Sequence, residues 1–497
     1  MMSYHWYFGK ELLSYIPFRI GREDKKINKK RLIIVSNREP YSHEKTEEGI
    51  ICRRSVGGVV SALDPLMQER RGIWIAWGSG SADFIVCNSD NEVLVPNDNP
   101  KYILKRVELS KDEIDNYYQG FSNRVLWPLF HLFIEKMHIK EEYWNFYRKV
   151  NEKFAKTVID ETNSDDLIWI HDYQLSLVPY FIRKVRPDAK IALFWHIPWP
   201  PWEIFDSLPQ RDELLEGILE SDLIGFHAKS YVRNFMECAI RKRGVEVDAK
   251  KSIVKVSNNK TKVRHFPLGI CYKDFAYSKE SQYASKNASQ LKERYEATHL
   301  ILGVDRLDYT KGILKRLKAF ELFLEENPQF RKKAVLAQVV TPSRYEIEEY
   351  NEMKKEIDET VGQINGRFGT EGWTPIKYFY RKISQQSLLE HYEAADVALL
   401  TPLRDGMNLV AKEYIASKEK EGVLILSEFA GASEGLNEAI TVNPYDIQAT
   451  AGAIKIAVEM PAEEKRQRFQ SMKKKVKERD ADWWLKKFLK EWEKIYA

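Results

Sequence analysis

Short apolar segments of strand type alternate with helical patterns along most of this chain. In the first half such segments begin at Arg31, Leu167 and Ile191, and in the second half at His299 and Val423. Alternation of this kind is typical of parallel sheets whose strands are joined by helices. A chain of 497 residues is too long for one hydrophobic core, so two domains are expected. The sequence therefore predicts an α/β protein with two doubly wound, Rossmann-like domains that face a central cleft.

The pattern loosens from Pro267 to Ser289, where Ser, Lys and Tyr are in excess. We place the junction there and predict an N-terminal domain at residues 31–267 and a C-terminal domain at residues 268–461. Residues 1–30 are aromatic and then basic, and they are expected to form an extension. Residues 462–497 are rich in Lys, Glu and Trp and are expected to be helical.

Composition narrows the function classes. The chain has 78 Lys and Arg against 73 Asp and Glu, a net charge of +5, which is too balanced to indicate nucleic acid but suits a small anionic substrate. No apolar run approaches the roughly 18 residues that cross a membrane, and residues 1–30 lack the apolar core of a signal peptide. Cys52, Cys87, Cys238 and Cys271 have no CxxC or metal spacing. We expect a cytoplasmic protein with reduced thiols and no metal.

The segment from Thr401 to Glu413 is the strongest candidate for the chemistry. It follows the apolar strand 395–400, turns at Asp405-Gly406, and enters a helical pattern near Asn408. The first N–H groups of a helix are unpaired and attract phosphate. Glu413 lies eight residues past Asp405, roughly 12 Å along the axis if all of this stretch is helical, which is about the span from a sugar ring across a diphosphate to a ribose. The alternative is an ordinary strand-to-helix connection with a solvated Glu.

Other predicted strands also end in polar residues. Arg38 follows the first strand, Asp172 and His196 follow two later ones, and Arg306 and Lys311 flank a tight loop before a helix. Ligands of open α/β sheets bind outside the carboxyl ends of the strands. Arg, Lys and a helix N-terminus together can hold a diphosphate. Taken singly, such an Arg is more often solvated and such a His more often structural.

Two further segments add to the candidate site. Gly57-Gly58 opens a helical pattern and allows the backbone to approach a phosphate closely. The segment 117–128 is unusually aromatic for one that reads as a loop, and aromatic faces suit a sugar ring, although most aromatic residues build the core.

With these segments in order, the chain resembles the trehalose-6-phosphate synthase family of retaining glycosyltransferases from about residue 31 to about residue 490. The resemblance rests on Val-Ser-Asn-Arg38, Gly57-Gly58, Tyr-Tyr118 with Leu-Trp127-Pro, Ile-His-Asp172-Tyr, His196-Ile-Pro, Arg306-Leu-Asp-Tyr-Thr-Lys311-Gly, Pro-Ser-Arg344 and Thr-Pro-Leu-Arg-Asp405-Gly-Met-Asn-Leu-Val-Ala-Lys-Glu413. The chain departs from the family in its first 30 residues, and no fused phosphatase is expected after residue 497.

The resemblance implies a GT-B fold whose last helical segment crosses back to the first domain. It also implies transfer of glucose from a nucleotide-glucose, usually UDP-glucose, to glucose 6-phosphate, which gives α,α-trehalose 6-phosphate and the nucleoside diphosphate. No metal or other cofactor is implied. The family is thought to use front-face attack, in which the leaving phosphate takes the acceptor proton, rather than the two carboxylates of a glycosidase.

Residue roles follow from the same resemblance. The implied catalytic residues are Asp405, His196, Arg306 and Lys311. The implied donor-binding residues are Gly57, Gly58, Arg306, Lys311, Ile383, Asp405, Asn408, Leu409, Val410, Ala411, Lys412 and Glu413. The implied acceptor-binding residues are Arg38, Tyr118, Trp127, Asp172 and Arg344.

Two alternatives stay open. The first is a related synthase with another phosphorylated acceptor, such as glycerol 3-phosphate or a pseudo-sugar. The second is a non-catalytic sensor of sugar phosphates, which should have lost some charged site residues. The sequence leaves open the nucleotide base, the role of residues 1–30, any regulation, and whether the chain forms a homo-oligomer. It indicates no nucleic-acid or membrane partner.

Overall fold

The computed structural model describes residues 30–55, 57–256, 259–344 and 348–496. Residues from Arg31 onward form one compact unit. The predicted extension at residues 1–30 lies outside the described residues except for Lys30. Within the described residues, no helix is both long enough and apolar enough to cross a membrane.

The first half of the unit is built on a large sheet that holds ten strands of the described chain. Its spatial order is β10 (Val245–Asp248), β11 (Ile253–Val256), β12 (Asn259–His265), β9 (Leu223–Phe226), β8 (Lys190–Trp195), β7 (Leu167–His171), β1 (Leu32–Arg38), β4 (Ile73–Trp77), β6 (Tyr102–Val107) and β5 (Glu92–Val95). The strands from β12 to β6 are parallel to one another, and antiparallel strands lie at both edges. A separate hairpin joins β2 (Tyr41–Thr46) to β3 (Gly49–Arg54).

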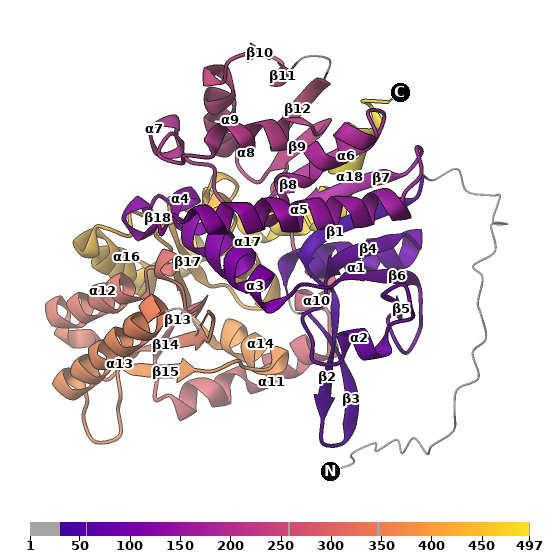
Figure 1. Ribbon diagram of the computed structural model, residues 1–497. Coiled ribbons are helices and arrows are strands. Elements are labelled where there is room, and N and C mark those ends of the chain that lie inside the picture. Colours follow the sequence, from indigo (N-terminus) through magenta and orange to yellow (C-terminus); the bar gives the residue numbers. More distant parts are fainter. Residues whose placement is uncertain (1–29, 56, 257–258, 345–347, 497) are drawn as a thin grey trace. The chain divides into compact units, whose positions relative to one another are not determined.

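The second half is built on a smaller sheet, entirely parallel, that holds six strands of the described chain. Its order is β15 (Ile376–Tyr380), β14 (Ala334–Thr341), β13 (His299–Arg306), β16 (Val397–Leu400), β17 (Val423–Ser427) and β18 (Ile440–Val442). In Figure 1 the two sheets are separate bodies of strands with helices packed around each. Two doubly wound parallel sheets confirm the predicted fold class.

Both sheets change winding direction at a defined place. In the first sheet the chain runs outward from β1 to β4 and β6, then returns to β7 on the other side of β1. In the second sheet it runs from β13 to β14 and β15, then returns to β16. A crevice forms outside the carboxyl ends of the strands at such a reversal. Arg38 ends β1, Asp172 follows β7, Arg306 ends β13, and Asp405 follows β16.

Helices cover both sheets. Those connected to the first sheet are α1 (Gly58–Arg70), α2 (Asp83–Val86), α3 (Lys111–Glu113), the π-helix η1 (Ile114–Leu126), α4 (Trp127–Phe130), η2 (Ile134–Lys136), α5 (Glu141–Glu161), η3 (Tyr173–Leu175), α6 (Val178–Val185), α7 (Trp202–Phe205), α8 (Arg211–Leu219) and α9 (Lys229–Arg241). The others are α10 (Tyr272–Ala276), α11 (Lys279–Arg294), η4 (Tyr309–Lys311), α12 (Ile313–Glu326), η5 (Pro328–Phe330), α13 (Glu348–Phe368), α14 (Gln385–Ala394), α15 (Leu409–Ser417), η6 (Gly431–Glu434), α16 (Ile447–Glu459), α17 (Ala462–Glu478) and α18 (Ala481–Glu493).

The first sheet separates two hydrophobic cores. Successive side chains of a strand point to opposite faces, so Ile33 and Val35 of β1 pack in a cluster with α5, whereas Leu32 and Ile34 pack in a cluster with α1. The second sheet and its helices share one further cluster. Burial on both faces explains why these strands read as continuous apolar runs.

The last helix, α18, packs on the first sheet. The ring of Phe488 is stacked on Trp169 of β7, with centroids 4.2 Å apart and planes within 5°. Trp484 donates its indole N–H to the carbonyl of Phe266 at 3.2 Å. In Figure 1, α18 lies in yellow beside β7. The C-terminal segment thus consists of two helices, α17 and α18, with α18 completing the core of the other half.

Two expectations about local structure are wrong. The aromatic segment after Tyr117 is not a loop but the π-helix η1, because its aromatic side chains face the core. Strand β1 does not stop before Arg38 but continues to it through an irregularity in its pairing with β4. The stretch from Pro267 to Ser289, where the junction is predicted, is largely helical, since α10 and α11 occupy most of it.

Candidate functional site

Two adjoining cavities lie where the carboxyl ends of the two sheets meet. The larger, about 800 Å³, is lined by all five residues predicted to bind the acceptor. The smaller, about 480 Å³, is lined by Gly57 and Gly58 from the first half and by the start of α15 from the second. The residues that line both are His196, Arg306, Lys311 and Asp405. We call these the acceptor cavity and the donor cavity, after the predicted roles of their residues.

The turn before α15 is held by Asp405. Its Oδ1 accepts hydrogen bonds from the N–H groups of Met407 at 3.3 Å and Asn408 at 3.1 Å. Asn408 takes a left-handed conformation, with φ of 69°, and its side chain caps the helix by accepting from the N–H of Ala411 at 3.2 Å. Asn tolerates this conformation better than most residues. The cap consumes one free N–H, and the first turn of α15 lies at the donor cavity as the sequence predicts.

Gly406 is required by a close approach between the halves. A Cβ atom at this position would lie 2.1 Å from the carbonyl oxygen of His196, a backbone atom that cannot move aside easily. The sequence suggested that a tight turn requires glycine at this position. The structure shows a further reason, which is that there is no room for a side chain. The hydroxyl of Tyr231, also from the first half, donates to the carbonyl of Asp405 at 3.0 Å. The Asp405 turn is therefore packed directly against the other half.

The two cations of the donor cavity differ in their surroundings. Lys311 donates to Oδ2 of Asp405 at 2.5 Å, and both side chains are mostly buried. Burial by itself would raise the pKa of Asp405, but the Lys311 charge and hydrogen bond outweigh it and lower the pKa. Arg306 is exposed and makes no ion pair with any carboxylate among the described residues. It is available to an anion.

Gly58 touches the donor side directly. A Cβ atom on Gly58 would lie 2.1 Å from Cδ1 of Leu409, whereas one on Gly57 would meet nothing within 4 Å. Leu409 and Gly58 both line the donor cavity. The glycine pair thus brings α1 of the first half against α15 of the second.

Arg344 is the most firmly held cation of the acceptor cavity. Its guanidinium lies 4.1 Å from the ring centroid of Trp127. It donates to the hydroxyl of Tyr350 at 2.7 Å and to Asp308 at 3.4 Å. Stacking on one side and hydrogen bonds on the other fix the plane of the guanidinium. Trp127 itself keeps a buried indole N–H with no partner among the described residues.

Arg38 is held more loosely. It is exposed, donates to the hydroxyl of Tyr118 at 3.1 Å, and lies 5.2 Å from the ring centroid of Trp77. Burial by itself would raise the pKa of Tyr118, but the charges of Arg38 and Arg344 outweigh it and lower the pKa. Two guanidinium groups thus act on one phenol, and the acceptor cavity is electropositive at this end.

Asp172 occupies a strained backbone position, with φ of 73°. Its Oδ1 accepts from the N–H of His196 at 3.1 Å. Burial raises the pKa of its carboxyl to about 7, although this N–H and that of Tyr173 lower it in part. Strained non-glycine residues persist where the surrounding structure holds them, and they cluster at functional sites.

A chain of three histidines runs behind the two cavities. Nδ1 of His171 lies 3.0 Å from Nε2 of His196, and Nδ1 of His196 lies 3.2 Å from Nε2 of His227. Burial lowers the pKa of all three imidazoles, and the neighbouring imidazole lowers those of His171 and His196 further. Each neutral ring has one donor and one acceptor nitrogen, so the tautomer of His196 is coupled to those of His171 and His227.

Some residues expected to bind the donor do not line the donor cavity itself. Ile383 packs on the core of the second half, and neither it nor Glu413 is among the residues that line the donor cavity. The carboxylate of Glu413 accepts a hydrogen bond from Tyr392 at 2.7 Å, which leaves Oε1 without a protein partner among the described residues. Lys412 turns into a different cavity. Ala411 is buried, and its N–H bonds to the cap.

Sequence reasoning missed several members of the site. His131 lines the acceptor cavity, His227 lines the donor cavity, and Asp308 and Tyr350 position Arg344. Asp308 lies inside the loop already singled out between Arg306 and Lys311, so its position was a usable signal. His227 ends the strand-type run 222–227, which was also a usable signal, whereas no strand end or glycine turn marks His131 or Tyr350.

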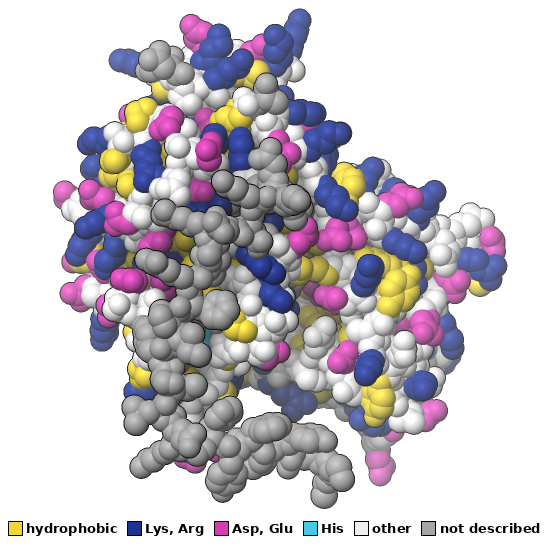
Figure 2. Space-filling model, turned by 90° about the vertical axis from the view of Figure 1, so that its right-hand side faces the viewer, with side chains coloured by type: hydrophobic (Ala, Val, Ile, Leu, Met, Phe, Trp, Pro, Cys, Tyr) yellow, Lys and Arg dark blue, Asp and Glu magenta, His cyan; other side chains and the backbone are white. Residues whose placement is uncertain are grey.

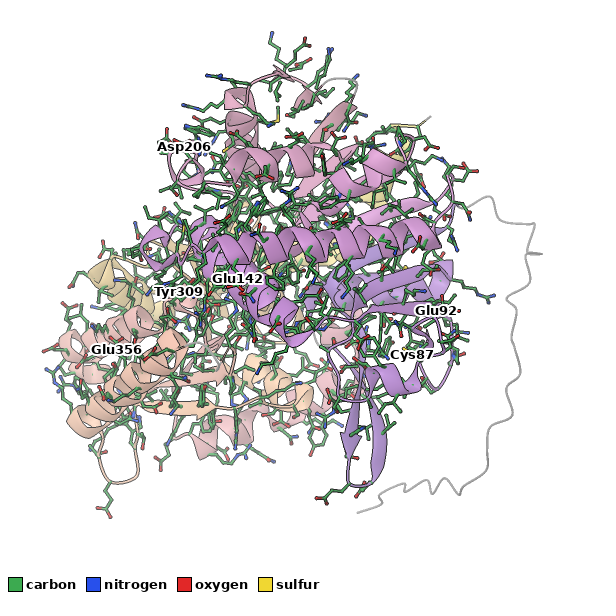
Figure 3. All side chains as sticks on the ribbon, in the orientation of Figure 1. Cys87, Glu92, Glu142, Asp206, Tyr309 and Glu356 are labelled. Carbon is green, nitrogen blue, oxygen red and sulfur yellow. The ribbon has the colours of Figure 1, made fainter. Side chains whose placement is uncertain are left out.

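Further contacts join the two halves beside the cavities. Tyr309, labelled in Figure 3, packs edge-on against Phe133, with ring centroids 5.0 Å apart. Glu434 accepts hydrogen bonds from the N–H groups of Lys229 and Ser230 at the start of α9. Two doubly wound sheets whose strand ends share one polar cleft define the GT-B type of glycosyltransferase fold.

The comparisons with known proteins agree with this fold. The sequence model of glycosyltransferase family 20 matches residues 30–494, and the chain belongs to this family. The resemblance found in the sequence is thereby confirmed.

Curated relatives are about 40% identical to the chain over the aligned residues. A bifunctional trehalose-6-phosphate synthase/phosphatase of Thermoproteus tenax is 42% identical over 92% of this chain and 63% of its own length. An alpha,alpha-trehalose-phosphate synthase [UDP-forming] A of Dictyostelium discoideum is 40% identical over 93% of this chain and 62% of its own. The chain thus spans less than two thirds of these two relatives. A trehalose-6-phosphate synthase of Mycolicibacterium smegmatis is 40% identical over 92% of this chain and 91% of its own length.

Solved structures match over most of the chain. An alpha,alpha-trehalose-phosphate synthase (UDP-forming) from Burkholderia xenovorans in complex with glucose-6-phosphate is 30% identical, with a TM-score of 0.84 over 93% of this chain and 100% of that one. A structure described as trehalose-6-phosphate from E. coli bound with UDP-2-fluoro glucose is 32% identical. Its TM-score is 0.83, over 93% of this chain and 98% of that one.

Proposed function

We propose that the chain transfers the glucosyl group of a nucleotide-glucose, preferably UDP-glucose, to glucose 6-phosphate. The products are α,α-trehalose 6-phosphate and the nucleoside diphosphate. One observation carries this proposal: His196, Arg306, Lys311 and Asp405 line both cavities. A transfer reaction needs its reacting groups at the boundary between donor and acceptor, and these four lie there. The names of the relatives and the ligands of the solved structures support the same reaction.

The donor cavity suits a diphosphate. Arg306 and Lys311 supply positive charge, the first turn of α15 supplies its dipole, and Gly58 brings backbone from the opposite half. The leaving diphosphate gains negative charge as the sugar–phosphate bond breaks. Preorganised positive groups at the place where charge develops are usually the largest catalytic contribution. Oε1 of Glu413 is the atom we assign to the ribose, and the segment around Ile383 is assigned to the base.

The acceptor cavity suits a sugar phosphate. Arg344 and Arg38 supply two guanidinium groups for the phosphate, and Tyr118 and Trp127 supply aromatic faces beside them. Arg pairs bidentately with phosphate oxygens. We assign Asp172 to a hydroxyl of the acceptor sugar. The His196 N–H donates to Oδ1 of Asp172 at 3.1 Å, and the side chain lines the acceptor cavity, so its carboxyl group is positioned before substrate arrives.

The chemistry proceeds without a protein nucleophile. The Asp405 carboxylate already accepts hydrogen bonds from Lys311, Met407 and Asn408, so it is poorly placed to attack carbon. In the proposed step the bond between the anomeric carbon and the diphosphate oxygen breaks while the acceptor oxygen bonds to the same face. The acceptor proton passes to the departing phosphate. Asp405 and His196 then orient the glucosyl group and stabilise its transient positive charge.

Domain limits and location are also proposals. All strands of the large sheet fall within residues 31–267, and those of the small sheet fall within residues 268–461, which supports the predicted boundaries. The four cysteines are free thiols, which supports a reducing, cytoplasmic environment.

A product assay tests the function. Purified protein is incubated with glucose 6-phosphate and, separately, UDP-, GDP- and ADP-glucose, and the sugar product is identified by mass spectrometry and NMR. The α,α-linked disaccharide phosphate is expected. If product forms with glycerol 3-phosphate and none forms with glucose 6-phosphate, the proposed acceptor is wrong and glycerol 3-phosphate takes its place. Tight binding of both substrates without any product would indicate a sensor.

The donor site is tested by Arg306→Ala. Arg306 is exposed in the free protein, but a diphosphate in the donor cavity would cover it, and truncation of one partner of such a charge pair costs about 2–5 kcal/mol. Turnover should therefore fall by a factor of about 30 or more. Arg367→Ala is the matched control, because Arg367 lies on the surface of α13 and pairs there with Glu321 and Glu325 of α12. Similar turnover for both variants would contradict the assignment of the diphosphate.

A further inference from the structure

A third cavity, of about 290 Å³, lies on the other side of the Asp405–Lys412 segment from the cleft. Its walls come from both halves and from the turn between α17 and α18. The basic side chains that line it are Lys229, His265, Lys412, Lys475, Arg479 and Lys487. Glu434 supplies the one carboxylate among the described residues of its lining. We call it the basic cavity.

Most of this positive charge has no partner in the protein. Glu434 is already engaged with the N–H groups of α9, and Lys475 forms an ion pair with Glu438 at 2.8 Å. In the part of the chain that the structure describes, four cations are left without an ion pair to a carboxylate. They are Lys229, Lys412, Arg479 and Lys487.

These cations disfavour one another's charge. Burial, together with the charge of Arg479, lowers the pKa of Lys412 to about 7. Burial and Arg479 also lower the pKa of Lys487, although Glu491 opposes the shift. Like charges in a partly dehydrated space disfavour one another. An anion among them would remove this repulsion.

The basic cavity also offers hydrogen-bond donors. Lys412 is buried, and its ammonium donates to the carbonyl of Leu268 at 2.5 Å, which leaves two of its three protons for another acceptor. Trp483 forms part of the wall and holds the Lys487 ammonium 4.8 Å from its ring centroid. The donors come from rigid elements and converge on one space.

This concentration of charge is not a general property of the protein. The net charge is only +5, and on the face in Figure 2 Lys and Arg side chains lie among Asp and Glu side chains. Charged side chains elsewhere form many ion pairs, so the basic cavity differs in that several cations face one space without carboxylates to neutralise them.

We propose that the basic cavity binds a small anion that carries a phosphoryl group, at a site separate from the donor and acceptor cavities. Inorganic phosphate, diphosphate and a phosphate monoester share the chemistry that Lys and Arg recognise. The cavity is smaller than the donor cavity, which favours a compact ligand over a nucleotide-sugar.

Occupation of this site is coupled to the cleft. His227 and Met407 line both the basic cavity and the donor cavity, and Nε2 of His227 contacts His196. The anion would also hold Lys229 of the first half close to Lys412 of the second. Any effect on donor affinity is reciprocal, because the donor must change the affinity of the anion by the same factor.

Calorimetry with inorganic pyrophosphate tests the site. The titration uses the full chain carrying Arg306→Ala and Arg344→Ala, which removes the main cations of the cleft. One equivalent of pyrophosphate should still bind, and more weakly at high salt. Adding Arg479→Gln and Lys487→Gln should weaken this binding by about tenfold or more for each cation. Lys486→Gln is the matched control, because Lys486 is the exposed neighbour on α18 and does not line the cavity.

The outcomes are distinct and do not depend on the proposed function. Absence of binding in the Arg306→Ala/Arg344→Ala protein, or equal weakening by Lys486→Gln, overturns the site. If Arg479→Gln with Lys487→Gln prevents folding, Lys229→Gln with Lys487→Gln replaces it and should give the same loss. Parallel titrations with inorganic phosphate and glucose 6-phosphate separate an inorganic ligand from a phosphate monoester.

Discussion

Arg344→Ala should weaken glucose 6-phosphate far more than the nucleotide-glucose. The side chain is 10% exposed and is fixed by the Trp127 ring, the Tyr350 hydroxyl and Asp308. A guanidinium held in this way has lost its freedom before the phosphate binds. Removal of such a charge costs about 2–5 kcal/mol. The KM for glucose 6-phosphate should therefore rise by a factor of between about 30 and a few thousand.

Two companion variants set the scale. Arg344→Lys keeps the charge but loses the stacking and the planar fork, so an intermediate effect, on the order of tenfold, is expected. Arg38→Ala should cost less than Arg344→Ala, since Arg38 is exposed and makes one hydrogen bond to Tyr118. Initial rates are measured with each substrate varied in turn, and thermal unfolding checks that every variant is folded.

Two results would refute this reasoning. Equal losses of affinity for both substrates would mean that Arg344 supports the whole cleft rather than the acceptor phosphate. A larger effect at Arg38 than at Arg344 would mean that the rigidity of a cation does not determine its contribution here.

Three further predictions concern the backbone, a carboxyl group and the last helix. Gly58→Ala should overpack Leu409 and cost about 1–3 kcal/mol of donor affinity, whereas Gly57→Ala should leave the unliganded fold unchanged by circular dichroism. Burial raises the pKa of Asp172 to about 7, so the native state keeps a proton that the unfolded chain loses near pH 4. The free energy of unfolding should therefore fall as the pH rises between these values. In urea unfolding, Asp172→Asn should reduce this fall, and an unchanged dependence of the unfolding free energy on pH would contradict the prediction. Phe488→Ala should lower the unfolding free energy by about 3–5 kcal/mol, measured in the same way, because its ring is fully buried on a tryptophan of β7.

Much of the fold could be predicted because doubly wound sheets bury their strands on both faces. Each such strand is then an apolar run, and each run ends in the polar residues that form the cleft. Arg38, Asp172, Arg306 and Asp405 were found in this way. The rule needs no knowledge of how the two sheets face one another.

The remainder depends on contacts that no local pattern encodes. The π-helix η1 reads as a loop because Gly120, Ser122 and Asn123, residue types that are common in turns, lie between its aromatic residues. All three are nevertheless buried in the structure. The pairing of His196 with His227 depends on neighbouring strands of the large sheet. The direction of the Lys412 side chain depends on a carbonyl far away in the sequence.

The position of α18 has a consequence for biosynthesis. Trp169 is translated well before Phe488, the ring that covers it, which belongs to α18. Domains generally begin to fold as they leave the ribosome, but one face of the large sheet must wait, with its aromatic side chains uncovered, until α18 has been translated. A polypeptide that ended before α18 would leave this apolar face exposed and prone to aggregation.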